Sequence, residues 1–97
     1  MTRRSNDQTL KEAVEGMLKA YKLDDKMNQI KLIESWERVM GPTVSKRTVD
    51  IKIYERKLYV SLNSASLRQE LFLEREKIRD LLNDEAGSVV IDEVVLR

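Results

Sequence analysis

Tyrosine and lysine side chains alternate with apolar ones in the middle of the chain, in a pattern that suits contact with nucleic acid. Tyr54 and Tyr59 lie among Lys52 and Lys57, in a segment where every second residue is apolar. A tyrosine ring can stack on an unpaired base, and a lysine ammonium can meet a phosphate oxygen. In a hairpin, all four side chains would share one open face, with Lys52 across from Tyr59. Ordinary cross-strand pairing on a solvated face explains the same residues, so both interpretations stay open.

A basic segment leads into this hairpin. The chain carries 18 Lys/Arg and 17 Asp/Glu, but Arg38–Lys57 holds six basic residues and only two acidic ones. Lys46 and Arg47 form a basic elbow before the first strand, where they can attract phosphates at short range. A solvated strand edge, protected from aggregation by lysine, is the alternative. The candidate nucleic-acid-binding residues are Lys46, Arg47, Lys52, Tyr54, Arg56, Lys57 and Tyr59.

Composition argues against catalytic and metal-binding chemistry. The chain has no histidine and no cysteine, so it lacks the commonest general base and every thiolate ligand or nucleophile. Its three glycines are too far apart to form a phosphate-binding loop. The carboxylates of residues 70–80 alternate with arginine and lysine at helical spacing, which predicts a salt-bridged surface. We therefore expect a binding module that is not an enzyme and that holds no metal and no cofactor.

Two helices are predicted before the hairpin. The first spans residues 9–22, where Thr9 begins a capping box. Asp24 and Asp25 would then cap a second helix that ends at Met40. Six apolar residues of the first helix share one amphipathic stripe: Leu10, Ala13, Val14, Met17, Leu18 and Tyr21.

The second helix carries the strongest core signal. Trp36 lies at the centre of its apolar stripe, so we expect the indole to be buried between this helix and the sheet. Gly41 can adopt the left-handed conformation and Pro42 cannot continue a helix, which marks the end of the helix strongly. The predicted structural core includes Trp36, Gly41, Val49, Ile51 and Val60.

The hairpin has a well-specified register, because a slip of one residue would turn its whole apolar face to solvent. The turn at residues 55–57 contains neither Gly nor Asn, so a four-residue loop is expected rather than a tight turn. The predicted apolar pairs are Val49 with Leu62, Ile51 with Val60, and Ile53 with Leu58.

A third helix and a third strand close the chain. The helix is expected to begin with Ser64 or with a capping box at residues 66–69, and to end near Asn83. Phe72 and Leu73 lie beside its apolar stripe, where they either pack on a neighbouring helix or form a patch that binds a partner. Residues 83–87 read as a turn, and the β-branched residues 88–97 as a strand joined through a helical crossover.

These elements predict one α+β domain with the order α-α-β-β-α-β and a three-stranded sheet covered by helices on one face. We expect this domain at residues 9–97, after a flexible segment at residues 1–8. No apolar run approaches the length of a membrane span, and the first residues do not form a signal peptide. The expected location is the cytoplasm.

Three segments together resemble the DciA family, whose proteins are tied to loading of the bacterial replicative helicase. They are the run from Trp36 to Thr48 (WERVMGPTVSKRT), the run from Leu58 to Leu71 (LYVSLNSASLRQEL), and the closing run from Ile91 to Arg97 (IDEVVLR). The short length is similar to the form of the family found in Bacteroidetes. The resemblance implies a KH-like domain, contact with the replicative helicase and affinity for DNA.

Two departures limit what the resemblance implies. The chain lacks the Gly-x-x-Gly loop with which a KH domain clamps a single strand, and it ends at the third strand, without the tail of longer relatives. Two other functions remain open: a KH-like nucleic-acid-binding protein, possibly for RNA, without a helicase role, and a structural interaction module. The sequence leaves the oligomeric state and the strand order of the sheet undetermined.

Overall fold

A computed structural model describes the backbone of residues 2–97 and the side chains of residues 9–97. The side chains of residues 1–8 lie outside the described part of the structure, so the predicted flexibility of this segment stays a prediction. Along the described chain the elements are α1 (Thr2–Glu34), α2 (Trp36–Met40), α3 (Pro42–Lys46), β1 (Thr48–Tyr54), β2 (Lys57–Leu62), α4 (Ala65–Leu73), α5 (Arg75–Ala86) and β3 (Glu93–Leu96).

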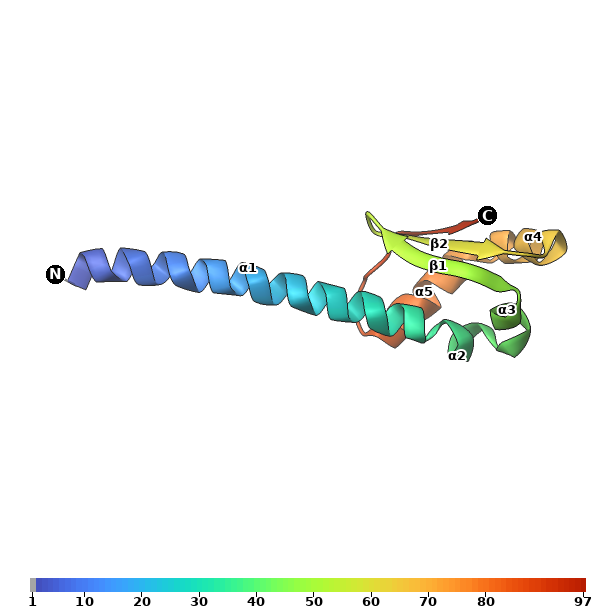
Figure 1. The fold of residues 1–97 in the computed structure, drawn as a ribbon, viewed down its shortest axis with the longest axis horizontal. Helices are drawn as coiled ribbons and strands as arrows, with labels where there is room; N and C mark the ends of the chain where they lie inside the picture. Colours follow the sequence, from blue (N-terminus) through green and yellow to red (C-terminus); the bar gives the residue numbers. More distant parts are fainter. Residues whose placement is uncertain (1) are drawn as a thin grey trace.

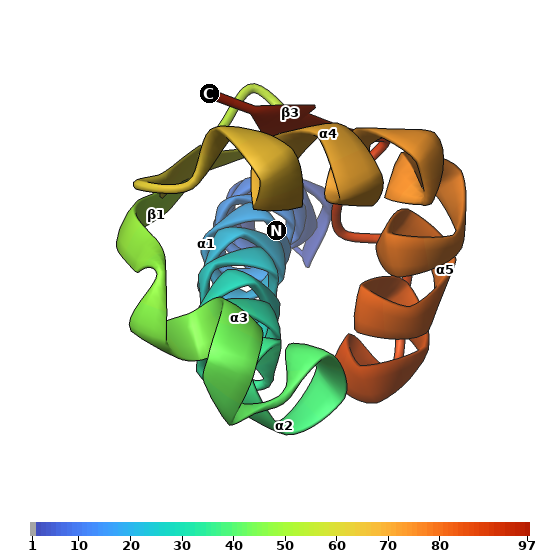
Figure 2. The same ribbon diagram turned by 90° about the vertical axis from the view of Figure 1, so that its right-hand side faces the viewer.

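The molecule is elongated because α1 projects far beyond the remaining elements (Figure 1). Its principal extents are 69 × 21 × 20 Å, and its radius of gyration is 18.7 Å, against about 12.5 Å for a compact domain of this length. Figure 2, a view along α1, shows the sheet, α2, α3 and α5 arranged around the C-terminal end of that helix. The last turns of α1 therefore belong to the domain, and the preceding turns do not.

The three strands form one sheet in the order β1-β2-β3. Strand β1 pairs with β2 as an antiparallel hairpin, and β3 pairs with β2 in parallel after the crossover through α4 and α5. The predicted pairs of Ile51 with Val60 and of Ile53 with Leu58 are confirmed. The predicted α+β class and order of elements are also confirmed, while the KH-like assignment stays a prediction.

The predicted pairing of Val49 with Leu62 is wrong, because β1 contains a bulge at its start. Leu62 pairs with Thr48, and Val49 becomes the extra residue, with its side chain 68% exposed. Thr48 turns inward because its hydroxyl accepts a hydrogen bond from the Trp36 indole (3.0 Å) and donates one to the Val44 carbonyl (2.9 Å). Val49 is therefore not part of the core.

The hairpin turn is also tighter than predicted. Tyr54 pairs with Lys57, which leaves a two-residue loop whose residues have positive φ, 49° at Glu55 and 63° at Arg56. Such a turn normally requires Gly or Asn. Here a contact from outside the hairpin holds it, since the Asp92 amide donates to the Arg56 carbonyl at 2.8 Å.

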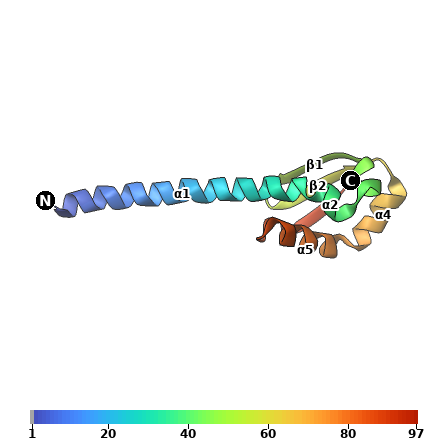
Figure 3. The same cartoon turned by 90° about the horizontal axis from the view of Figure 1, so that it is seen from below.

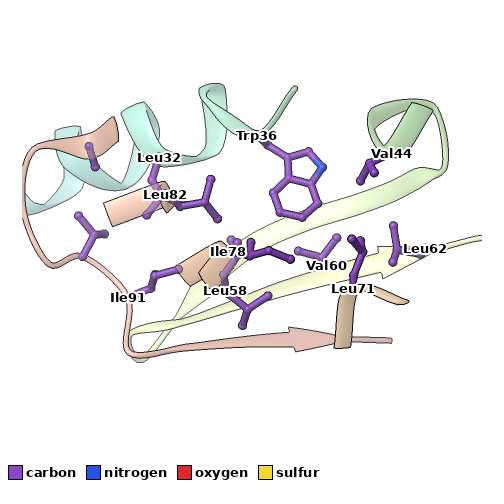
Figure 4. Close-up of a cluster of buried hydrophobic side chains, with 13 residues drawn as sticks. Leu32, Trp36, Val44, Leu58, Val60, Leu62, Leu71, Ile78, Leu82 and Ile91 are labelled. Carbon is purple, nitrogen blue, oxygen red and sulfur yellow. The ribbon is translucent and has the colours of Figure 1, made fainter. Parts of the chain in front are cut away.

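The core lies between the sheet and the helices (Figure 4). Trp36 is 4% exposed, and its indole lies between α2 and the sheet, near Val60 and Val44. The predicted burial of Trp36 is thus confirmed. Leu32, Leu58, Val60, Leu82 and Ile91 are the largest apolar side chains with essentially no exposed area.

The predicted helix boundary at Asp24 and Asp25 is wrong, because α1 continues through both residues. The Gln29 amide donates to the Asp25 carboxylate at 3.4 Å, a contact across one turn that supports a helix. The helix ends instead at Glu34, before Ser35, a buried residue whose hydroxyl donates to the Leu32 carbonyl at 2.7 Å. A side chain that bonds its own preceding turn in this way competes with regular helix geometry.

The remaining boundaries shift for local reasons. Ser64 caps α4, as predicted, by accepting a hydrogen bond from the Leu67 amide. The predicted single helix is divided at Glu74, and α5 then runs past Asn83 to a left-handed C-cap at Gly87. Gly41 ends α2 with φ 86° and ψ 168°, a positive φ that is not the left-handed helical conformation expected. The residues before Glu93 are not a strand, so β3 is shorter than predicted.

Candidate nucleic-acid interface

One face of the sheet is free of helices, since α1 and α5 lie on its other side (Figures 1 and 2). The pairings set three rows across this open face, from β1 to β3. The outer row is Tyr54, Lys57 and Glu93; the middle row is Lys52, Tyr59 and Val95. The last row is Asp50 and Ser61 with Arg97, whose amide donates to the Val60 carbonyl and whose carbonyl accepts from the Leu62 amide.

Four of these side chains surround an open hollow of about 430 Å³, to which Ile53 also contributes. They are Lys52, Tyr54, Tyr59 and Arg97, and we call this set the tyrosine face. The Arg97 guanidinium lies over the Tyr59 ring, 4.9 Å from its centroid. Tyr54 is 63% exposed. The hollow thus combines one ring free to stack, a second ring already covered by a cation, and two positive charges, a combination suited to a single-stranded nucleic acid.

Arg56 is not part of the tyrosine face, and its charge is paired with a carboxylate. The Arg56 guanidinium forms two hydrogen bonds with the Asp92 carboxylate, at 2.9 and 3.0 Å, and a third with the Val89 carbonyl at 3.3 Å. The hydrogen bond from Arg56 lowers the pKa of Asp92, and the same bond raises the pKa of Arg56. Arg56 therefore joins the hairpin tip to the segment before β3.

Lys57 is partly neutralised as well, because its ammonium lies 3.8 Å from the Glu93 carboxylate on β3. By contrast, none of the described ion pairs includes Lys46, Arg47 or Lys52. The seven predicted residues thus fall into two groups. Arg56 and Lys57 are ion-paired, whereas Lys46, Arg47 and Lys52 are in none of the described ion pairs. The Tyr54 ring is exposed, and the Tyr59 ring is covered by Arg97.

The basic elbow lies at the far end of β1 from the hairpin tip. Lys46 ends α3 and Arg47 caps it, and both side chains are exposed. The Arg47 carbonyl accepts a hydrogen bond from the Asn63 amide at 3.0 Å, which fixes the elbow beside the end of β2. Five residues of extended chain separate Arg47 from Lys52, a distance of roughly 17 Å. The elbow and the tyrosine face are therefore two separate surfaces of the domain.

Sequence reasoning missed Arg97 as a site residue. Its position on the open face depends on the parallel pairing of β3 with β2, which places Val95 level with Tyr59. Period-two alternation from the buried Val94 would have assigned Val95 and Arg97 to the outer face, once β3 was known to lie beside β2. The strand order was the missing information.

Phe72 and Leu73 lie at the end of α4 and are 51% and 79% exposed, so neither belongs to the buried core. The Arg75 guanidinium covers one face of the Phe72 ring at 4.0 Å and donates to the Phe72 carbonyl. The interpretation of these two residues as a partner patch therefore remains a prediction.

The described residues hold no further candidate site of two other kinds. They contain no group of three or more His, Cys, Asp or Glu side chains that could hold a metal ion. Among the same residues, no helix combines the length and the apolar character that a membrane crossing requires.

Comparison with known proteins gave one match. No curated protein and no solved structure matched the chain. The family model described as "Dna[CI] antecedent, DciA" matches residues 9–96, which is nearly the whole chain. That family is associated with helicase loading in DNA replication and is not a catalytic family. With this match over nearly its full length, the chain belongs to the DciA family.

Proposed function

We propose that this protein is a non-enzymatic accessory factor of DNA replication, which binds the replicative helicase and contacts DNA through the tyrosine face and the basic elbow. The observation that carries the DNA contact is the open hollow lined by Lys52, Tyr54, Tyr59 and Arg97. Family membership supports the helicase as partner. A function in replication fits a protein of the cytoplasm.

The tyrosine face is tested by titrating a labelled single-stranded oligonucleotide and following its fluorescence anisotropy. Tyr54→Ala should weaken binding by about 1–3 kcal/mol, because one stacked base is lost. Tyr54→Phe keeps the ring and should bind like the unmodified protein. An unchanged affinity for Tyr54→Ala would show that this face does not stack bases.

The charges are tested in the same titration at two salt concentrations. Lys52→Glu, and Lys46→Glu combined with Arg47→Glu, should weaken binding to all sequences about equally and reduce its salt dependence, since phosphate contacts position without specifying. Lys77→Glu is the matched control, because Lys77 is exposed on α5, on the other side of the sheet. Equal losses in the control and the site variants would indicate a general charge effect and contradict the site.

The helicase contact is tested by retention of the cognate replicative helicase at low salt. Phe72→Ser combined with Leu73→Ser should reduce retention, because large exposed apolar side chains are the usual anchors of an interface. The melting temperature should stay within about two degrees, as expected for surface positions. Leu81→Ser, at another exposed apolar residue, is the control. Failure of the unmodified protein to retain the helicase would contradict the helicase role itself.

The titration also separates the two other functions. An RNA oligonucleotide bound more tightly than DNA of the same sequence, without helicase retention, would indicate an RNA-binding role. If the protein binds neither nucleic acid but retains the helicase, the result would indicate an interaction module without a nucleic-acid-binding role.

A further inference from the structure

Helix α1 extends far beyond the elements that support it. It has 33 residues, or about 50 Å of helix, and in Figures 1 and 3 its N-terminal turns meet no other element. Every described side chain from Thr9 to Met27 is exposed. Contact with the domain begins near Asn28, whose amide donates to the Ser88 hydroxyl at 3.2 Å.

This unsupported part of α1 carries an apolar stripe that should favour a partner. Its five large side chains are between 47% and 76% exposed. A helix in water is marginally stable without tertiary contacts, and the interior Gly16 weakens this one further, by about 1 kcal/mol. A second helix packed on the stripe would supply the missing contacts. We call Leu10, Val14, Met17, Leu18 and Tyr21 the α1 stripe.

The α1 stripe continues the surface with which α1 packs on its own domain. Leu32, which is fully buried, follows Val14 by about five helical turns and so lies on the same side of α1. Asn28 has the same relation to Leu10. The occupant of the stripe would therefore lie in line with the existing contact between α1 and α5.

The net charge of α1 indicates which kind of partner can pack on the stripe. From Thr9 to Glu34 the helix holds five lysines and five acidic residues, so it has no net attraction for a polyanion such as DNA. A second copy of this helix would also meet no net like-charge repulsion, because the three Lys and two Glu of residues 9–23 nearly balance.

We propose that the α1 stripe pairs with the α1 stripe of a second copy of this chain as an antiparallel two-helix contact. A register centred between Glu15 and Gly16 places Leu10 level with Tyr21 and Val14 level with Met17, so that the two stripes face each other over their whole length. The two domains then lie at opposite ends of the helix pair, and their sheet faces stay open.

The size of the stripe sets the strength of this contact. Five large side chains from each copy would bury on the order of 1,000 Å² in total, at the lower limit for a specific interface. The dimer should therefore dissociate on dilution. Sedimentation equilibrium of the full chain should give a mass near 11.4 kDa in dilute samples, and roughly twice that at several hundred micromolar. A monomer at every concentration would overturn the proposal.

Two double variants test which face of α1 is used. Val14→Ser with Met17→Ser removes two side chains of the stripe and should keep the protein monomeric at the highest concentration. Leu23→Ser with Met27→Ser removes two equally exposed side chains from the opposite side of α1 and should leave dimerisation unchanged. If both variants lose the dimer to the same extent, the contact is not the α1 stripe.

The orientation can be read from cross-linking, because the natural chain has no cysteine. A mixture of Leu10→Cys and Tyr21→Cys proteins should form a mixed disulfide, whereas Leu10→Cys alone should form little. Efficient disulfide formation by Leu10→Cys alone would show a parallel pair and contradict the antiparallel register.

Discussion

Trp36 joins three elements through packing and one hydrogen bond. The indole is buried in the core, and its N–H donates to the Thr48 hydroxyl, which itself bonds the Val44 carbonyl. The same small network turns Thr48 inward and creates the bulge that exposes Val49. One aromatic residue therefore determines both the centre of the core and the geometry with which β1 begins.

Trp36→Ala should lower the free energy of unfolding by about 3–5 kcal/mol, because a large buried side chain is replaced by a cavity. Urea denaturation gives the value. Trp36→Phe should cost much less, since it keeps most of the packing and loses the hydrogen bond. An unchanged denaturation midpoint in the alanine variant would contradict the central place of this residue.

Asn83 holds the segment before β3 from a buried position. Its side-chain oxygen accepts from the Val90 and Ile91 amides at 2.9 and 3.1 Å, and its amide donates to the Ile91 carbonyl at 2.9 Å. Val90 and Ile91 are thereby buried without forming a strand. The side chain of Asn83 thus replaces the hydrogen bonds that a neighbouring strand would otherwise supply.

Asn83→Ala should cost about 2–4 kcal/mol, because three buried backbone groups lose their partner. Thermal or urea unfolding measures this loss in the free energy of unfolding. Asn63→Ala, at an exposed asparagine, is the control and should change stability by less than about 0.5 kcal/mol. Similar small effects in both variants would show that water replaces the Asn83 contacts.

Asp92 should give the protein a pH-dependent contribution to stability. Its pKa is lowered in the folded state, first by the hydrogen bond from Arg56, so the contribution is present above the unfolded pKa of about 3.9. It should be lost as the pH falls through the lower, folded value. The effect is small because both side chains are at least half exposed.

The measurement compares the unmodified protein with Asp92→Asn in unfolding experiments from pH 7 to pH 2. The difference between them should disappear in acid. Arg56→Gln should lose stability over the same pH range. The double variant should lose no more free energy of unfolding than either single variant. A difference that persists at the lowest pH would mean that Asp92 acts through something other than its charge.

At the scale of elements, the hairpin turn illustrates a local conformation imposed from outside. Glu55 and Arg56 adopt positive φ, which costs a non-glycine residue roughly 1–2 kcal/mol. Asp92 compensates by binding both the backbone and the side chain of Arg56. The segment before β3 therefore stabilises a turn to which it is not adjacent in sequence.

Glu55→Asn should raise the free energy of unfolding by about 0.5–1 kcal/mol, because asparagine tolerates positive φ. Urea denaturation tests this. Asp50→Asn, on the same strand pair but outside the turn, is the control and should give no such gain. A loss of stability in Glu55→Asn would show that the Glu55 side chain makes a compensating contact.

At the scale of the whole molecule, the long α1 determines the shape. Small-angle X-ray scattering of dilute monomer should give a radius of gyration near 18.7 Å, with the maximum dimension close to 69 Å. A helix that folds back on the domain would instead bring the radius toward about 12.5 Å. The Val14→Ser and Met17→Ser double variant should give the same monomer curve, since its substitutions affect only the contact between copies.

The sequence by itself determined the class of fold, the order of the elements and most of the hairpin register. These depend on local patterns: the apolar period, the cap at Ser64 and the Gly-Pro stop at Gly41. It also identified Trp36 as a core residue and Tyr54 and Tyr59 as residues of one face. For those positions, burial follows directly from periodicity.

The tertiary structure alone decided the features that depend on contacts between distant segments. The bulge at Val49 requires Trp36 to meet Thr48, and the tight turn requires Asp92 to reach Arg56. Likewise, Arg97 joins the tyrosine face only because β3 pairs with β2. Arg56 and Lys57 resemble free cations in the sequence, and only their placement opposite Asp92 and Glu93 shows that their charges are already paired.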